Sequence, residues 1–216
     1  MPQLFTCDTL GMEKFAKIVK SGGVVAFPTD TVYGIGCDPY NDSAVEKVFA
    51  VKSRDKGKAL PVLVRDISTA EKLIELSEVT RQLASTFWPG GLTILAPQKD
   101  FAISPLVTAN SGELALRVPA NECLNLALAS LKVIVGTSAN LSGAAPAKTA
   151  TDVINSKLAC DCVLDGGRVS GVESTIIREK RGLPVAESIS VVREGVIARS
   201  KIMAVIRDFE VENEIL

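Results

Sequence analysis

The chain has 216 residues, of which 24 are Lys or Arg, 25 are Asp or Glu, five are Cys and none is His. The absence of histidine excludes a Ser-His-Asp or Cys-His nucleophile relay, a zinc site that needs imidazole and an imidazole general base. A formal net charge of −1 argues against a protein that binds nucleic acid through an overall basic surface.

The length and composition predict one domain over residues 1–216, because a hydrophobic share of 47% with 23% charged residues is ordinary for a globular protein. The stretch 208–216 carries acidic residues and no basic one, so we expect a solvated acidic tail there.

The chain has an odd number of cysteines, and none of them form a C-x-x-C pair. They stand at positions 7, 37, 123, 160 and 162. We therefore expect five reduced thiols, no structural zinc and a cytoplasmic location. The first ten residues lack the regions of a secretory signal, and no apolar stretch approaches the ~20 residues of a membrane span. These features predict a soluble protein with no membrane partner.

Taken in chain order, apolar residues at helical spacing follow Asp8, which is a good helix N-cap, and Gly22-Gly23 ends that helix. Further helices are expected at 42–51, 67–75, 78–87, 121–130, 149–157 and 199–207. Short apolar runs predict strands at 24–27, 60–64, 92–96, 114–118, 133–135, 161–165, 174–178 and 189–193. The segments 97–112 and 136–147 are expected to be loops. Because helices and strands alternate, the pattern favours an α/β or α+β fold with helices on the faces of an open sheet.

Polar, small and cationic residues gather where expected elements end. Pro28 to Gly34 follows the strand at 24–27, Lys52-Ser53-Arg54 follows the helix at 42–51, and Gly136 to Gly143 follows the strand at 133–135. Ligands of open sheets bind outside strand ends, so this placement predicts one shared pocket. Each segment taken alone is equally typical of a turn or a solvated surface.

Arg117 stands inside an apolar strand. A buried guanidinium needs an anionic partner, which is either a side chain or a ligand. The phosphate motifs G-x-x-x-x-G-K-[ST] and G-x-G-x-x-G are absent from the sequence. A nucleotide would therefore have to be held by scattered Lys and Arg, by hydroxyls and by loop amides.

Six motifs, in order along the chain, resemble one family. They are Gly22 to Gly34, Lys52-Ser53-Arg54, Trp88 to Thr93, Leu116 to Pro119, Thr137 to Gly143 and Gly171 to Thr175. Over about residues 10–200 the chain resembles the YrdC-like threonylcarbamoyl-AMP synthases. The resemblance implies a twisted, mixed open sheet flanked by helices, with a concave basic face.

The same resemblance implies an enzyme, a nucleotidyltransferase. It would condense L-threonine, bicarbonate or carbon dioxide, and ATP to threonylcarbamoyl-AMP and release pyrophosphate. The product would feed threonylcarbamoyladenosine modification of tRNA through downstream transfer proteins. Mg²⁺ would arrive bound to ATP, and the resemblance implies no tightly bound cofactor and no protein metal site.

Position by position, the resemblance implies roles for individual side chains. Thr31, Arg117 and Ser174 would bind threonine, with Arg117 on its carboxylate. Lys52 and Arg54 would be the catalytic cations beside the phosphates. The nucleotide contacts would come from Arg54, Lys58, Ser138, Asn140 and Arg193.

Two other functions stay open. One is a carbamoyltransferase that makes carbamoyl-adenylate from carbamoyl phosphate, since this type of domain occurs there too. The other is a non-enzymatic module that binds tRNA or double-stranded RNA through the basic stretch 47–58. Aromatic residues are only 5% of the chain, which disfavours base stacking and hence the RNA module. Weak RNA binding is compatible with the enzyme as well.

Overall fold

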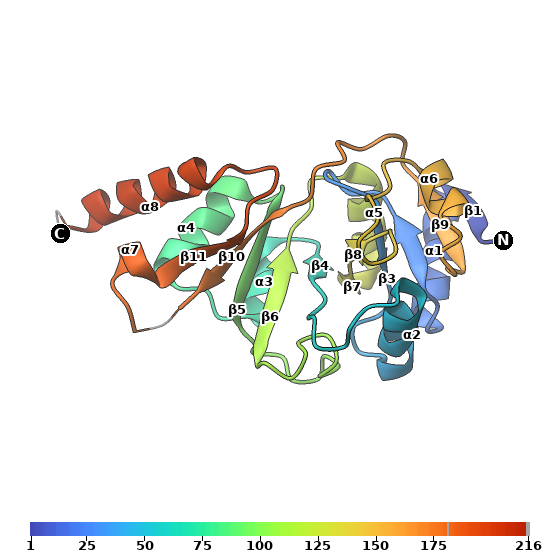
Figure 1. Cartoon of the computed structure of the whole chain (residues 1–216), viewed down its shortest axis with the longest axis horizontal. Coiled ribbons are helices and arrows are strands. Elements are labelled where there is room, and N and C mark those ends of the chain that lie inside the picture. Colours follow the sequence, from blue (N-terminus) through green and yellow to red (C-terminus); the bar gives the residue numbers. More distant parts are fainter. Residues whose placement is uncertain (181, 215–216) are drawn as a thin grey trace.

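The computed structural model describes residues 1–180 and 182–214 and arranges them in two mixed sheets that lie side by side (Figure 1). Sheet A has the strand order β1-β9-β2-β3-β8, and sheet B has the order β11-β10-β5-β6-β4-β7. The strands of sheet A are β1 (Gln3–Thr6), β9 (Cys162–Asp165), β2 (Val25–Phe27), β3 (Gly34–Gly36) and β8 (Thr137–Ser138). Those of sheet B are β11 (Ile189–Arg193), β10 (Thr175–Glu179), β5 (Leu92–Pro97), β6 (Glu113–Arg117), β4 (Val62–Val64) and β7 (Val133–Val135).

Helices cover the outer faces of the two sheets (Figure 1). They are α1 (Thr9–Lys20), α2 (Asp42–Lys52), α3 (Ile67–Leu73), α4 (Glu78–Phe87), α5 (Glu122–Leu131), α6 (Ala150–Asn155), α7 (Val185–Ser188) and α8 (Arg199–Glu214). Asp8 caps α1 by accepting a hydrogen bond from the backbone N–H of Gly11, as the sequence predicts. Within the described ranges, none of these helices combines the length and the apolar character that crossing a membrane requires.

The alternation of side chains along sheet B separates a core face from a ligand face. Leu92 and Ile94 of β5 are fully buried in the main hydrophobic core, beneath the helices. Thr93 and Leu95 point to the opposite face and line a cavity. Because side chains alternate across a strand, the packing that stabilises the sheet also fixes which residues face the cavity.

Sheet A packs against α1 and α5 through a second apolar cluster. Phe15 of α1 meets Phe27 of β2 edge to face, with ring centroids 6.2 Å apart. Phe27 is fully buried, and the chain leaves β2 directly after it. This packing therefore anchors the start of the segment that carries Thr29 to Thr31.

Gly36 lies where β3 of sheet A passes β7 of sheet B. A Cβ atom at this position would stand 1.6 Å from the carbonyl oxygen of Val135, so only glycine fits. Gly34 similarly leaves room for the ring of Phe27, because its Cβ would lie 2.7 Å from that ring. The short G-x-G sequence of this strand therefore serves close packing, Gly34 within sheet A and Gly36 between the two sheets.

The prediction of a mixed α/β fold is confirmed, and the structure divides the strands expected in one open sheet between two mixed sheets. The structure has two sheets, and it adds β1, β3, β8 and α7, which the sequence pattern did not indicate. Strands β3 and β8 contain three residues and two residues, and such short elements carry too few side chains for a recognisable period. Residues 137–138 consequently looked like part of a loop.

The prediction of five reduced thiols is wrong. Cys7 and Cys123 form a disulfide across a sequence separation of 116 residues, with their Cα atoms 5.4 Å apart. Their pairing depends on α1 packing beside α5, which residue spacing cannot show. Since disulfides are rare in cytosolic proteins, the thiols no longer support the predicted cytoplasmic location.

The three free cysteines are Cys37, Cys160 and Cys162. Burial raises the pKa of their thiols to about 12, about 11 and about 12 respectively. Thiols that stay protonated are poor nucleophiles, so these three residues act in packing.

The acidic stretch expected as a solvated tail at 208–216 has exposed Asp208 and Glu212 side chains, but up to Glu214 it is helical. Helix α8 continues to Glu214, and Phe209 packs against the main hydrophobic core. In this stretch Phe209 is half-buried while Asp208, Val211 and Glu212 are exposed, so the helix contacts the core along one side only. Residues 215–216 lie outside the described part of the chain.

Candidate functional site

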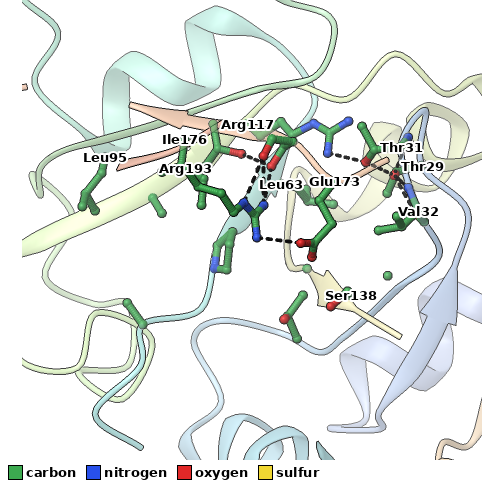
Figure 2. A pocket seen from close by; sticks show the side chains of 18 of the residues that line it. Thr29, Thr31, Val32, Leu63, Leu95, Arg117, Ser138, Glu173, Ile176 and Arg193 are labelled. Atoms are coloured by element: carbon green, nitrogen blue, oxygen red, sulfur yellow. Dashed lines mark hydrogen bonds and ion pairs between the residues drawn. The ribbon is translucent and has the colours of Figure 1, made fainter. Parts of the chain in front are cut away.

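A cavity of about 250 Å³ lies on the inner face of sheet B, where segments of sheet A close it from the side. Sheet B contributes residues of β4, β5, β6, β10 and β11, and sheet A contributes the segments around β3 and β8. The charged residues that line it are Arg54, Arg117, Glu173 and Arg193, and Figure 2 labels the last three of these. The segments predicted to share a pocket therefore do meet around one cavity.

The segment that leaves β2 forms a hydroxyl relay at the cavity wall. The guanidinium of Arg117 donates to Thr31 Oγ1 at 2.8 Å, and Thr31 Oγ1 lies 2.9 Å from Thr29 Oγ1. Thr29 Oγ1 in turn donates to the carbonyl oxygen of Val32 at 2.7 Å. This direction of donation lets Thr31 give its own proton to Thr29 and accept from the arginine, so both hydroxyls are fixed (Figure 2).

Arg117 is held from three sides. Its Nη2 donates to Asp30 Oδ1 at 2.5 Å, and its Nε donates to the carbonyl oxygen of Gly90 at 2.8 Å. The side chain is 6% exposed, while the Asp30 carboxylate is 19% exposed. Burial lowers the pKa of Arg117, and Asp30 acts in the opposite direction, so the guanidinium keeps its charge. The anionic partner that the sequence demanded is therefore a side chain.

Arg54 and Arg193 are the more exposed cations of the cavity. Arg54 donates to the backbone carbonyls of Lys58 and Ala59 at 3.2 and 2.8 Å. Burial and then the charge of Arg193 lower the pKa of Arg54. Two arginines whose charges repel each other form a favourable place for an anion.

Arg193 is fixed by the segment before β10. It donates to the carbonyl oxygen of Ser174 from Nε at 3.1 Å and from Nη2 at 3.0 Å, and its Nη1 lies 3.2 Å from Glu173 Oε2. Ser174 Oγ accepts from Arg193 Nη2 at 3.1 Å and from Thr93 Oγ1 at 2.9 Å. Because both acceptor positions of this hydroxyl are filled, its own proton is left to donate.

Lys52 lies behind the cavity wall. It is 2% exposed, and its Nζ donates to the carbonyl oxygens of Ser138 and Asn140 at 2.5 and 2.7 Å. Burial, and then the charge of Arg54, lower the pKa of Lys52 to about 8. Lys52 therefore holds the segment after β7 in place, and its ammonium does not form part of the cavity lining.

The other predicted nucleotide contacts divide into residues that line the cavity and residues that lie outside its lining. Ser138 lines the cavity, whereas Asn140 and Lys58 do not. Asn140 donates its side-chain amide to the carbonyls of Leu141 and Ala144, and its Oδ1 is buried without a hydrogen-bond partner. Lys58 is exposed at the surface, where its carbonyl oxygen orients Arg54.

Sequence reasoning missed several residues of the site, among them Asp30, Glu173 and Thr93. Asp30 and Glu173 stand inside motifs that the sequence brought forward, but their roles depend on arginines 87 and 20 positions away. Thr93 stands in the segment Trp88 to Thr93 and contacts a serine 81 positions away. The available signal was that Asp30 and Glu173 each stand next to a predicted hydroxyl contact, Thr31 and Ser174, whereas Thr93 gave no such signal.

Comparison with known proteins gives a consistent result. A family model for Sua5, YciO and YrdC proteins, described as "Telomere recombination", matches residues 17–195. The chain is 37% identical over 206 residues to the threonylcarbamoyl-AMP synthase of Bacillus subtilis (strain 168), a match that covers 91% of this chain and 57% of that protein. It is 35% identical over 166 residues to the protein of the same name from Pyrococcus abyssi (strain GE5 / Orsay), which covers 75% of this chain and 48% of that protein.

A solved structure is also similar. The crystal structure of P. abyssi Sua5 complexed with L-threonine matches with a TM-score of 0.85 and 30% sequence identity. The match covers 95% of this chain and 61% of that chain. The chain thus spans about half the length of the curated relatives it matches.

Proposed function

The chain belongs to the Sua5/YciO/YrdC family, and from this premise we propose that it forms threonylcarbamoyl-AMP from L-threonine, bicarbonate and ATP, with release of pyrophosphate. The observation that carries the proposal is the cavity itself. It combines a buried, fixed arginine, Arg117, with two more exposed arginines, Arg54 and Arg193, and with the hydroxyls of Thr31, Ser138 and Ser174.

Arg117 and its hydroxyl relay suit the amino-acid carboxylate. Three of the five guanidinium N–H groups are bound to the protein, so the remaining two can donate to a ligand in the cavity. The proton of Ser174 can donate to the same ligand. A site whose donors are fixed before the ligand arrives loses little entropy on binding.

Arg54 and Arg193 suit the phosphates of ATP. Their mutual repulsion would be relieved by an anion, and guanidinium groups bind phosphate oxygens in a bidentate way. Ser138 would contact the nucleotide from the segment that Lys52 fixes. Lys52 would then act by shaping this segment and by adding positive charge from behind it, while Asn140 and Lys58 would need to move to reach the ligand.

The proposed reaction needs no protein nucleophile. The amine of threonine reacts with bicarbonate to give a carbamate and water, and a carbamate oxygen then forms the bond to the α-phosphorus while pyrophosphate leaves. The chain would supply alignment and positive charge, which are effective means of accelerating such a step. The absence of histidine is compatible with this chemistry.

Magnesium fits this site only as part of the substrate. Glu173 is the single carboxylate among the described residues that line the cavity, and it is paired with Arg193. The described residues also contain no group of three or more His, Cys, Asp or Glu placed to hold a metal. The phosphate oxygens of ATP would therefore hold Mg²⁺, whose charge would offset that of the triphosphate.

The test is direct formation of the product. The chain is incubated with ATP, Mg²⁺, threonine and bicarbonate, and the adenylate is measured by mass spectrometry, with each substrate omitted in turn. Arg193→Gln should lower the rate by at least about 100-fold, since it removes a positive charge that would lie beside the reacting phosphates. Arg178→Gln is the matched control, because this arginine pairs with Glu113 and does not line the cavity.

Three results would decide against the proposal. One is the absence of any threonine-dependent adenylate, and a second is formation of an adenylate from carbamoyl phosphate instead, as a carbamoyltransferase would give. The third is tight binding of tRNA without any turnover, as a non-enzymatic RNA module would show. Passage of the product to downstream tRNA-modifying proteins belongs to the proposal as well.

A further inference from the structure

Glu173 is an unusual residue for a cavity expected to bind phosphates. Among the described residues, it is the only carboxylate that lines the cavity, beside Arg54, Arg117 and Arg193. Asp30 neutralises Arg117 from behind the wall, so it leaves Glu173 as the acidic group that a ligand would meet. Its carboxylate acts electrostatically on both Lys52 and Arg54.

The backbone of Glu173 is held in a defined position. Its carbonyl oxygen accepts from the N–H of Val196 at 2.9 Å, and the next carbonyl, that of Ser174, accepts twice from Arg193. Gly195 packs directly on this segment, because a Cβ there would lie 2.3 Å from the carbonyl oxygen of Glu173. The segment is therefore built to present this side chain at one place in the cavity.

The side chain itself has capacity for a ligand. It is 40% exposed, and its Oε2 lies 3.2 Å from Arg193 Nη1. Within the described part of the chain, Oε1 has no hydrogen-bond partner. Figure 2 shows the Glu173 carboxylate between Arg193 and the segment that carries Ser138.

We propose that Glu173 binds the ammonium group of the amino-acid substrate, an inference that rests on the proposed function. An amino acid enters as a zwitterion, and its carboxylate would be bound by Arg117. Its ammonium would then lie in a cavity that also holds Arg54 and Arg193, where like charges repel it unless a carboxylate is present. Glu173 supplies that carboxylate with an oxygen to spare.

The competing role for Glu173 is that of a counter-ion, which balances the positive charge of Arg193 until phosphates displace the carboxylate. The two roles predict opposite results when the charge is removed. If Glu173 binds the ammonium of threonine, removing its charge weakens threonine binding. If Glu173 is only a counter-ion of Arg193, removing its charge leaves threonine binding unchanged and makes nucleotide binding tighter.

Binding measured by isothermal titration calorimetry separates them. Glu173→Gln keeps the shape and removes the charge, and it should weaken threonine binding roughly 10- to 100-fold, as for loss of a hydrogen bond to a charged group. Two probes locate the effect. Threoninol lacks the carboxylate, and its binding to Glu173→Gln should be weakened by the same factor as that of threonine. The probe 2,3-dihydroxybutanoate lacks the ammonium, and Glu173→Gln should bind it within about twofold of the wild-type affinity.

Glu113→Gln is the matched control, because Glu113 also forms an ion pair with an arginine, at 3.4 Å, but lies outside the cavity lining. It should leave threonine affinity unchanged. Glu173→Asp retains the charge and should fall between wild type and Glu173→Gln, and circular dichroism checks that each variant is folded. If Glu173→Gln does not fold, Glu173→Asp with the same probes provides the test.

Failure of the inference can be told from failure of the proposed function. If the wild-type chain forms the adenylate and Glu173→Gln binds threonine within twofold of wild type, the inference is overturned and the function stands. Equal weakening of threonine and 2,3-dihydroxybutanoate would also overturn it. If the wild-type chain neither binds threonine nor forms the adenylate, the proposed function falls and the inference with it.

Discussion

Replacing Asp30 by Asn tests whether the buried ion pair fixes the cavity. Asn keeps an oxygen that can accept from the N–H of Ala120, as Asp30 Oδ1 does at 3.0 Å, so the substitution mainly removes the charge opposite Arg117. Removing one partner of a buried pair costs about 3–5 kcal/mol, because the other charge is left in a poorly solvated place. The Asp30 carboxylate is 19% exposed, so we expect the lower end, about 3 kcal/mol of unfolding free energy.

Urea unfolding at neutral pH, followed by circular dichroism, measures this loss. The double variant Asp30→Asn/Arg117→Met removes both charges, and it should recover about half of the loss, since its hydrogen bonds to Gly90 and Thr31 are still missing. The control is Glu113→Gln, in a more exposed pair that should contribute at most about 1 kcal/mol. A loss below about 1 kcal/mol for Asp30→Asn, or strict additivity of the two changes, would refute the reasoning.

Three further predictions concern the framework around the cavity. The pKa of Lys52 is about 8 in the folded chain and about 10.4 in the unfolded chain. Between these two pH values Lys52 is protonated in the unfolded chain and neutral in the folded chain. The free energy of unfolding of the wild type, relative to Lys52→Met, should therefore rise with pH across this window by up to roughly 3 kcal/mol; a pH-independent difference in urea titrations would contradict it. Cys7→Ser should lower the stability by about 2–5 kcal/mol, because it opens a loop of 116 residues, and dithiothreitol should abolish the difference from wild type. Gly36→Ala should cost more than about 3 kcal/mol through its clash with Val135, whereas Gly57→Ala, whose Cβ meets nothing closer than 3.4 Å, should change stability by less than about 1 kcal/mol in the same assay.

The helices show how far local sequence determines the fold. Helix α4 spans Glu78–Phe87, as predicted, because Ser77 caps its start by accepting from the N–H of Thr80 and a Trp-Pro-Gly-Gly turn follows its end. Both signals are contained in the helix and its neighbours. The division into two sheets depends instead on very short strands: β3 pairs with the nearby β2 over three residues, and β8 joins β3 over only two residues from about 100 positions further along the chain.

The candidate site likewise divides into features that local sequence indicates and features that depend on contacts between distant residues. Arg117 could be recognised because an arginine in an apolar strand is a local contradiction that needs an explanation. Its partner could not, because Asp30 stands in a segment that reads equally well as a turn. Lys52 was recognised as important, but its contacts with two backbone carbonyls depend on where α2 ends relative to β8. Sequence indicated which charges matter, and only the fold shows which of them face the ligand.

The absence of histidine leaves Lys52 as the residue that could make this site respond to pH. No side chain of the chain has an ordinary pKa between about 5 and 8, because only histidine does. The cavity is lined by arginines, which keep their charge across the physiological range. Lys52 has a pKa of about 8 and holds two carbonyls, those of Ser138 and Asn140, and a neutral amine still has two hydrogens to donate to them. Raising the pH through about 8 should therefore remove a positive charge behind the nucleotide segment without releasing it, so nucleotide affinity should fall while the segment keeps its shape.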